Sequence, residues 1–196
     1  MAEISNGISV GAAGSEVHVR VVGRGTFQNG QTLRRYAFGM MDRGGEEFFV
    51  DLSRCQGMDS TFLGVLAGIG LRLAQIGQTG KVHILNVGPR NWELLQTLGL
   101  DRLFAINTTG NLRTKMPLPA DAEFQRLPES ELGEVTPPLS KHDTVDLMLE
   151  AHDNLIRADQ RNLAKFKDLT QFLRENVAKR AAPPTPAPPT GPAPST

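Results

Sequence analysis

DLSRCQGMDSTFLGVL, residues 51–66, is the stretch of sequence that decides the fold. It starts inside a short apolar run, Phe48 to Leu52, which follows a glycine turn and is typical of a buried central strand. Ser53 to Asp59 is predicted to be a loop. From Ser60 to Gln78, apolar side chains recur every three or four residues, which predicts one buried face of a helix. The stretch therefore indicates a strand, a loop and a helix in succession.

The segments on both sides alternate between strand and helix patterns in the same way. Between Glu16 and Val22, valines alternate with polar residues, as in a strand with one buried face. Further helices are predicted at 31–41 and 90–98, and further strands at 81–87 and 101–106. Such alternation is typical of α/β domains, in which helices cross over between parallel strands. We therefore predict a small mixed sheet of four to five strands, packed with helices, that ends near residue 107.

The residues beyond 107 divide by composition into three parts. Residues 108–139 contain several prolines and little periodicity, so we predict a linker. Residues 140–180 carry a recurring apolar stripe, which predicts an amphipathic helical segment, either one long helix or two with a break between Ile156 and Leu163. Residues 181–196 hold more than half of the 13 prolines and no aromatic or charged side chain, which predicts a disordered tail. The α/β domain itself is predicted to span residues 1–107.

Charge and cysteine content exclude several classes of protein. The chain holds 21 basic and 21 acidic residues, whereas a protein that neutralises phosphates of nucleic acid needs a basic excess. Its only cysteine, Cys55, excludes an intramolecular disulfide and fits a reducing compartment. The N-terminus, MAEISNGISV, lacks the pattern of a signal peptide, and no apolar run is long enough to cross a bilayer. We expect a cytoplasmic protein that binds neither nucleic acid nor membrane.

Catalytic signatures are missing from the sequence. The phosphate-loop, Rossmann, nucleophile-elbow and zinc-protease motifs do not occur, and His142 and His152 are too far apart for a helical metal site. We therefore predict no metal, no cofactor and no enzymatic activity. Asp51 and Asp59 could form a carboxylate pair, but neither has a basic companion at a useful spacing. Asp51 is more simply interpreted as ordering the end of its strand, and Asp59 or Ser60 as the cap of the following helix.

Three groups of motifs together resemble a known family. The first group lies within residues 51–66 and consists of D-L-S, M-D-S-T and L-G-V-L. The second is G-x-V-x-I-L-N-V at 80–87, and the third is L-L-x-T-L-G-L-D-x-L-F at 94–104. In this order and spacing, the sequence from roughly residue 8 to residue 107 resembles the STAS domain of bacterial anti-sigma factor antagonists. The resemblance implies a small mixed α/β fold and a partner that is both an anti-sigma factor and a serine kinase, with a serine phosphatase that reverses the modification. In the family, the kinase modifies the hydroxyl residue directly after the aspartate of the motif, which here is Ser60, with Thr61 as the alternative.

The resemblance also implies that the residues around Ser60 contact the partner, namely Met58, Asp59, Ser60, Thr61, Phe62 and Gly64. Phe62 stands where the commonest form of the motif has glycine, so its side chain belongs either to the core or to the partner surface. A phosphate on Ser60 would add about two negative charges at the positive end of a helix dipole, which the domain tolerates and a docked partner does not. The implied function is that of an anti-sigma factor antagonist, a phosphorylation-controlled switch between partners in transcription regulation.

The predicted helical segment at 140–180 is compatible with a second function. Its apolar stripe could pack onto the α/β domain, or it could join two chains into a homodimer through residues 140–180. In the second case the chain would be a STAS scaffold or signalling subunit that assembles through its C-terminal helix without a phosphorylation switch.

Overall fold

The computed structural model describes residues 7–76, 80–107, 124–127 and 140–181 of the 196-residue chain. Its strands and helices follow in chain order as β1 (Gly7–Ala13), β2 (Glu16–Gly25), α1 (Phe27–Met41), β3 (Glu47–Met58), α2 (Ser60–Ile76), β4 (Lys81–Leu85), α3 (Pro89–Thr97), β5 (Ala105–Asn107), β6 (Gln125–Arg126), α4 (Lys141–Ala158) and α5 (Asn162–Ala181). The predicted fold class, a mixed α/β sheet followed by additional C-terminal helices, is confirmed.

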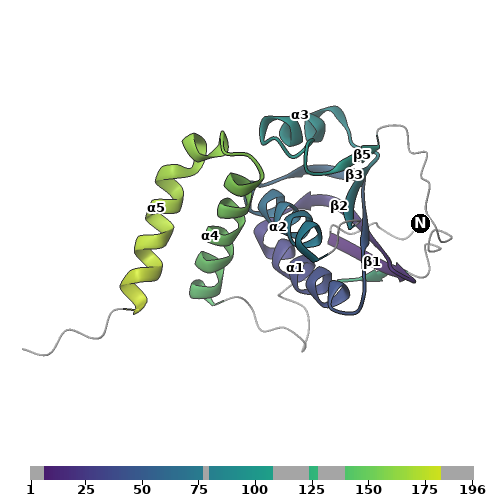
Figure 1. The fold of residues 1–196 in the computed structure, drawn as a ribbon, viewed down its shortest axis with the longest axis horizontal. Coiled ribbons are helices and arrows are strands. Elements are labelled where there is room, and N and C mark those ends of the chain that lie inside the picture. The colour runs from purple at the N-terminus through teal and green to yellow at the C-terminus, as the bar shows by residue number, and fades with distance from the viewer. Residues whose placement is uncertain (1–6, 77–79, 108–123, 128–139, 182–196) are drawn as a thin grey trace, which may run out of the picture.

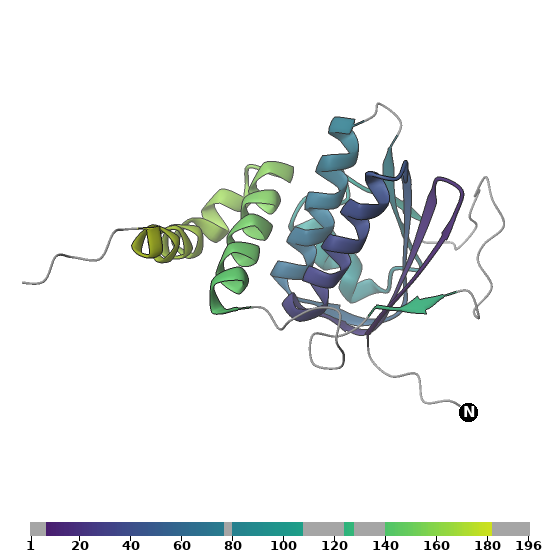
Figure 2. The ribbon, with the colours of Figure 1, turned by 90° about the horizontal axis from the view of Figure 1, so that it is seen from below.

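The sheet has six strands in the order β5-β4-β3-β2-β1-β6 (Figure 1). β2 to β5 run parallel to one another, because α1, α2 and α3 cross over between them. β1 pairs antiparallel with β2 on one side and with β6 on the other. Figure 2 shows α1 and α2 side by side against one face of the sheet, where the valines of β2 and the apolar run of β3 form the core.

Two strands were not predicted. β1 has the sequence GISVGAA, and its glycines and alanines give it little intrinsic preference for a strand, yet it pairs with β2 along its whole length. β6 lies within the predicted linker and adds two residues to the outer edge of β1. Most of the predicted linker and the proline-rich tail lie outside the described residues.

The prediction of a loop at Ser53–Asp59 was wrong. β3 continues to Met58, and its end pairs with β2 as far as Gly25, with register shifts on the way. β4 pairs only with the first part of β3, from Glu47 to Asp51, so the rest of β3 has a neighbour on one side only. Three residues of this part, Ser53, Arg54 and Gln56, are exposed and polar, which gave the sequence the composition of a loop.

Two further boundaries differ from the prediction. α1 begins at Phe27, so Asn29 and Gly30 belong to its first turn and not to a preceding turn. The last predicted strand, 101–106, is reduced to Ala105–Asn107, because residues 101–104 form turns after Gly99, whose φ of 68° is left-handed.

The C-terminal segment forms two helices that meet at Asp159, inside the interval where the apolar stripe is interrupted. α4 packs against α2 on the side away from the sheet, and α5 lies beyond α4 (Figures 1 and 2). None of the helices in the described ranges is long and apolar enough to cross a membrane.

Candidate functional site at the start of helix α2

Asp59 joins the starts of two helices. Its Oδ1 accepts a hydrogen bond from the backbone N–H of Phe62 at 2.7 Å, which caps α2. Its Oδ2 accepts from the backbone N–H of Phe27 at 3.0 Å, the first residue of α1. The Asp59 N–H in turn donates to the carbonyl of Gly25 at the end of β2. The interpretation of Asp59 as a cap therefore agrees with the geometry, and both carboxylate oxygens serve the backbone.

Phe62 lies in the core. Its side chain is 0% exposed and fills the space above Gly25 and Gly30. A Cβ added at Gly25 would lie 2.6 Å from the Phe62 ring, so only glycine allows β2 to end this close to α2. Of the two alternatives for Phe62, the structure shows the core position, and Gly25 and Gly30 leave the space for its ring.

Ser60 is the first residue of α2 and is half-buried. Its Oγ lies 3.0 Å from Nε2 of His152, a residue of α4 that is 2% exposed. Nδ1 of His152 lies 2.7 Å from the Met148 carbonyl oxygen, which can only accept a hydrogen bond, so Nδ1 carries a proton. In the neutral imidazole, Nε2 is then the acceptor and the Ser60 hydroxyl is the donor.

His152 also contacts α5, where the Phe166 ring packs edge-on against it at a centroid distance of 4.9 Å. Sequence reasoning missed this role of His152. No local signal could have revealed it, because the two partners are separated by 92 positions and meet only through helix packing.

Thr61, the alternative modification site, is 5% exposed. Ser60 is the more accessible of the two hydroxyl residues. The geometry therefore favours Ser60 over Thr61 as the residue that an enzyme could reach.

The glycines of α2 let α4 approach closely. A Cβ added at Gly64 would lie 2.2 Å from the backbone oxygen of Ala151, so the two helix backbones are nearly in contact there. One turn further, Gly68 lies under the side chain of Asn154. At these two positions the interior glycines of α2 face α4.

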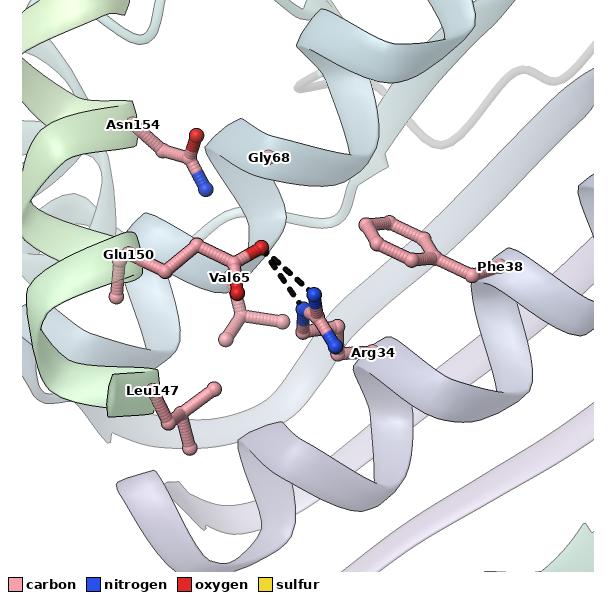
Figure 3. Close-up of a pocket in the computed structure, with 8 residues that line it drawn as sticks. Arg34, Phe38, Val65, Gly68, Leu147, Glu150 and Asn154 are labelled. Carbon is pink, nitrogen blue, oxygen red and sulfur yellow. Dashed lines mark hydrogen bonds and ion pairs between the residues drawn. The ribbon is translucent and has the colours of Figure 1, made fainter. Parts of the chain in front are cut away.

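A narrow crevice lies where α1, α2 and α4 meet (Figure 3). Figure 3 shows Glu150 of α4 reaching toward Arg34 of α1, and the two form an ion pair at 2.8 Å. Both side chains are partly exposed, so solvent screens the pair and its contribution to stability is small. The crevice marks the edge of the α4 contact.

The predicted partner-binding residues form no open surface in this conformation. Met58 is 7% exposed, Thr61 and Phe62 are buried, and Gly64 lies under α4. Only Asp59 and Ser60 of the predicted set are half-exposed. The structure brings these residues together near the start of α2, and α4 covers two of them, Ser60 and Gly64.

Asp51 lies at the point where β4 stops pairing with β3. Burial disfavours its charge, but hydrogen bonds from Asn86 and Ser53, together with the nearby guanidinium of Arg20, outweigh burial and hold the pKa of Asp51 below its usual value. These partners agree with the interpretation that Asp51 orders the end of its strand. Within the described residues, no three histidine, cysteine, aspartate or glutamate side chains are grouped as a metal site.

Comparisons with known proteins give a likeness of structure. No protein-family profile matches the chain, and no curated protein matches it. A putative anti-sigma factor antagonist from Thermotoga maritima is 20% identical, with 50% of this chain and 84% of that chain covered and a TM-score of 0.46. An anti-sigma factor antagonist from Mycobacterium paratuberculosis is 21% identical, with 55% of this chain and 90% of that chain covered and a TM-score of 0.47.

The phosphorylated form of the Bacillus cell fate determinant SpoIIAA is a further similar structure, at 19% identity and a TM-score of 0.44, with 52% of this chain and 92% of that chain covered. All three TM-scores lie below 0.5. Over about half of its length, this chain is similar to solved structures of anti-sigma factor antagonists.

Proposed function

We propose that the unmodified protein binds an anti-sigma factor that is also a serine kinase, and that this kinase ends the complex by phosphorylating Ser60. The observation that carries the proposal is the place of Ser60: it is the first residue of α2, directly follows the capping Asp59, and is more accessible than Thr61. These residues stand where the resembling family has its aspartate and its modified hydroxyl.

The modification is a phosphoryl transfer from ATP. The Ser60 oxygen bonds to the γ-phosphorus, the bond between that phosphorus and the oxygen of the leaving ADP breaks, and the hydroxyl proton passes to a base of the kinase. The reaction needs ATP, which places the proposed switch in the cytoplasm. A serine phosphatase restores the hydroxyl by transferring the phosphoryl group to water.

The position of Ser60 accounts for a switch that leaves the α/β fold intact. The first N–H groups of α2 point toward this end of the helix, and the phosphate would add about two negative charges to the positive end of its dipole. A partner docked over Ser60 would instead meet a strongly hydrated dianion, and its own carboxylates would be repelled. Binding is lost while the protein stays folded.

Intact-mass spectrometry after incubation with ATP, Mg²⁺ and an anti-sigma kinase of the same organism tests the proposal. The wild-type chain is expected to gain one phosphate, Ser60→Ala none, and Thr61→Val one. If the wild-type chain gains no phosphate, or if Ser60→Ala gains one, Ser60 is not the control point.

A second candidate function is assembly through α5. Leu163, Leu169 and Phe172 are 48%, 39% and 62% exposed on this helix, which is a large apolar exposure for one element. Under this alternative the chain is a scaffold that dimerises, with no phosphorylation switch. Light scattering would then give the mass of a dimer for the wild-type chain and of a monomer for Phe172→Glu, whereas a monomeric wild-type chain would exclude it.

A further inference from the structure

Helix α4 covers the face of α2 that the proposed function requires. His152 binds the Ser60 hydroxyl, Ala151 sits on Gly64, and Asn154 lies over Gly68. These contacts follow α2 from its first residue for more than two turns. Whatever binds or modifies the start of α2 must therefore either accept α4 as part of the surface or displace it.

The hydroxyl of Ser60 is already engaged on the side where an enzyme would need it. A kinase places its own base within hydrogen-bond distance of the acceptor hydroxyl, about 2.6–3.2 Å. Nε2 of His152 occupies that distance at 3.0 Å, and the Phe166 ring closes the space behind the imidazole. While Nε2 of His152 accepts the hydroxyl proton of Ser60, the base of a kinase cannot take that proton.

The contact between α2 and α4 is suited to opening. Around Ser60 and Gly64 it consists of small or polar groups, since glycine faces alanine and serine faces histidine, and such groups bury little apolar area. The large buried side chains that α4 contributes are Leu147 and Leu155. Phe62, Leu63, Leu66 and Ile69 of α2 are all buried in the core.

The far end of α4 is held independently of Ser60. Asp159 pairs with Arg102 and Arg161, and the side-chain N–H of Asn162 donates to the carbonyl of Leu98 at 2.9 Å. Lys165 donates to the carbonyl of Thr97. This corner between α4 and α5 is therefore attached to the end of α3 and the segment after it by contacts that do not involve Ser60.

From these contacts we propose that α4 is an intramolecular lid over Ser60: it competes with the partner for the start of α2, and the Ser60 site becomes available only when α4 swings away from Gly64 and His152 releases the hydroxyl. The lid rests on the proposed function for its biological role, but its existence is tested without a kinase.

Gly64 and Gly68 provide a matched pair of variants. Alanine has a higher intrinsic helix propensity than glycine, so neither change weakens α2 itself. At Gly64 the new methyl group would meet backbone atoms of Ala151, which cannot yield unless α4 moves. At Gly68 it would meet the end of the Asn154 side chain, which can rotate away. Gly64→Ala should open the lid and Gly68→Ala should not.

The test measures the reaction of a thiol at position 60 with 5,5′-dithiobis(2-nitrobenzoate) in the full chain, using Ser60→Cys in a Cys55→Ser background. Burial raises the pKa of the Cys55 thiol, so it reacts slowly, and its replacement removes the remaining background. Adding Gly64→Ala is expected to raise the labelling rate about tenfold or more, because the added methyl group overpacks the contact with α4 and favours the open state. Adding Gly68→Ala is expected to change the rate by less than about threefold.

Equal labelling rates for both glycine variants overturn the lid. If the thiol variant does not fold, as judged by circular dichroism, hydrogen exchange of the amides of α4 in Gly64→Ala and Gly68→Ala decides instead, and equal protection overturns it. The two proposals fail separately. If Gly64→Ala raises the labelling rate but the kinase adds no phosphate to Ser60, the lid stands and the switch is wrong. If the kinase phosphorylates Ser60 but the two glycine variants label equally fast, the switch stands and the lid is wrong.

Discussion

At the residue scale, the start of α2 is organised by groups that serve the backbone and by one that does not. Both carboxylate oxygens of Asp59 accept hydrogen bonds from the starts of α1 and α2, and the Phe62 ring fills the space beside Gly25 and Gly30. Ser60 is different, because its hydroxyl binds a side chain from a distant helix. The cap and the helix were predictable from local sequence, since aspartate before a periodic apolar run is a local pattern. The histidine partner was not, because a contact across 92 positions has no local signature.

The pairing of Gly25 with Phe62 gives a prediction at this scale. Gly25→Ala should destabilise the protein by about 2 kcal/mol, because the added methyl group overlaps the buried Phe62 ring. Urea unfolding measures the loss, and Gly57→Ala is the matched control, because nothing lies within 4 Å of a Cβ built there. Adding Phe62→Leu to Gly25→Ala should recover part of the loss. If the two substitutions are simply additive, the close approach does not explain the glycine.

At the element scale, the alternation of strands and helices was predictable because apolar periodicity reports which face each element buries. The strand edges were harder. β1 carries weak strand formers and is a strand because β2 offers it a partner along its length, while the end of β3 carries loop-like side chains because only β2 pairs with it. Pairing overrides local preference in both cases. The break between α4 and α5 was visible in the sequence. The packing of α4 on α2 depends on Gly64 and Gly68, and small residues in a helix indicate a close approach without showing which element approaches.

The corner between α4 and α5 carries a prediction about pH. Hydrogen bonds from Arg161, aided by the charge of Arg102, lower the pKa of Asp159 to about 2 from its ordinary 3.8. Folding therefore favours the ionised carboxylate, and the stabilisation is present above about pH 4 and is lost as the pH falls toward 2. The difference in unfolding free energy between wild type and Asp159→Asn should be largest above pH 4 and shrink toward pH 2. A difference that does not change over this range would show that Asp159 does not anchor the corner through its charge.

At the scale of the whole molecule, a small α/β domain carries its own helical cover. The chain has equal numbers of acidic and basic residues, so a single phosphate would be a large change relative to its net charge. The same phosphate would fall under α4, next to the imidazole of His152, so modification of one residue acts on the contact between two parts of the fold. On this account, the partner, the kinase and α4 all compete for the first turns of α2.

Binding of an anti-sigma kinase from the same organism to three forms of the full chain, measured by calorimetric titration, tests the central claim most directly. The account predicts that the wild-type chain binds, and that Ser60→Ala binds at least as tightly, because its side chain is neutral and no longer holds His152. Ser60→Glu should bind about a hundredfold more weakly, because a charge is placed where the partner docks. Equal affinities for Ser60→Ala and Ser60→Glu, or no binding by the wild-type chain and Ser60→Ala, would contradict it.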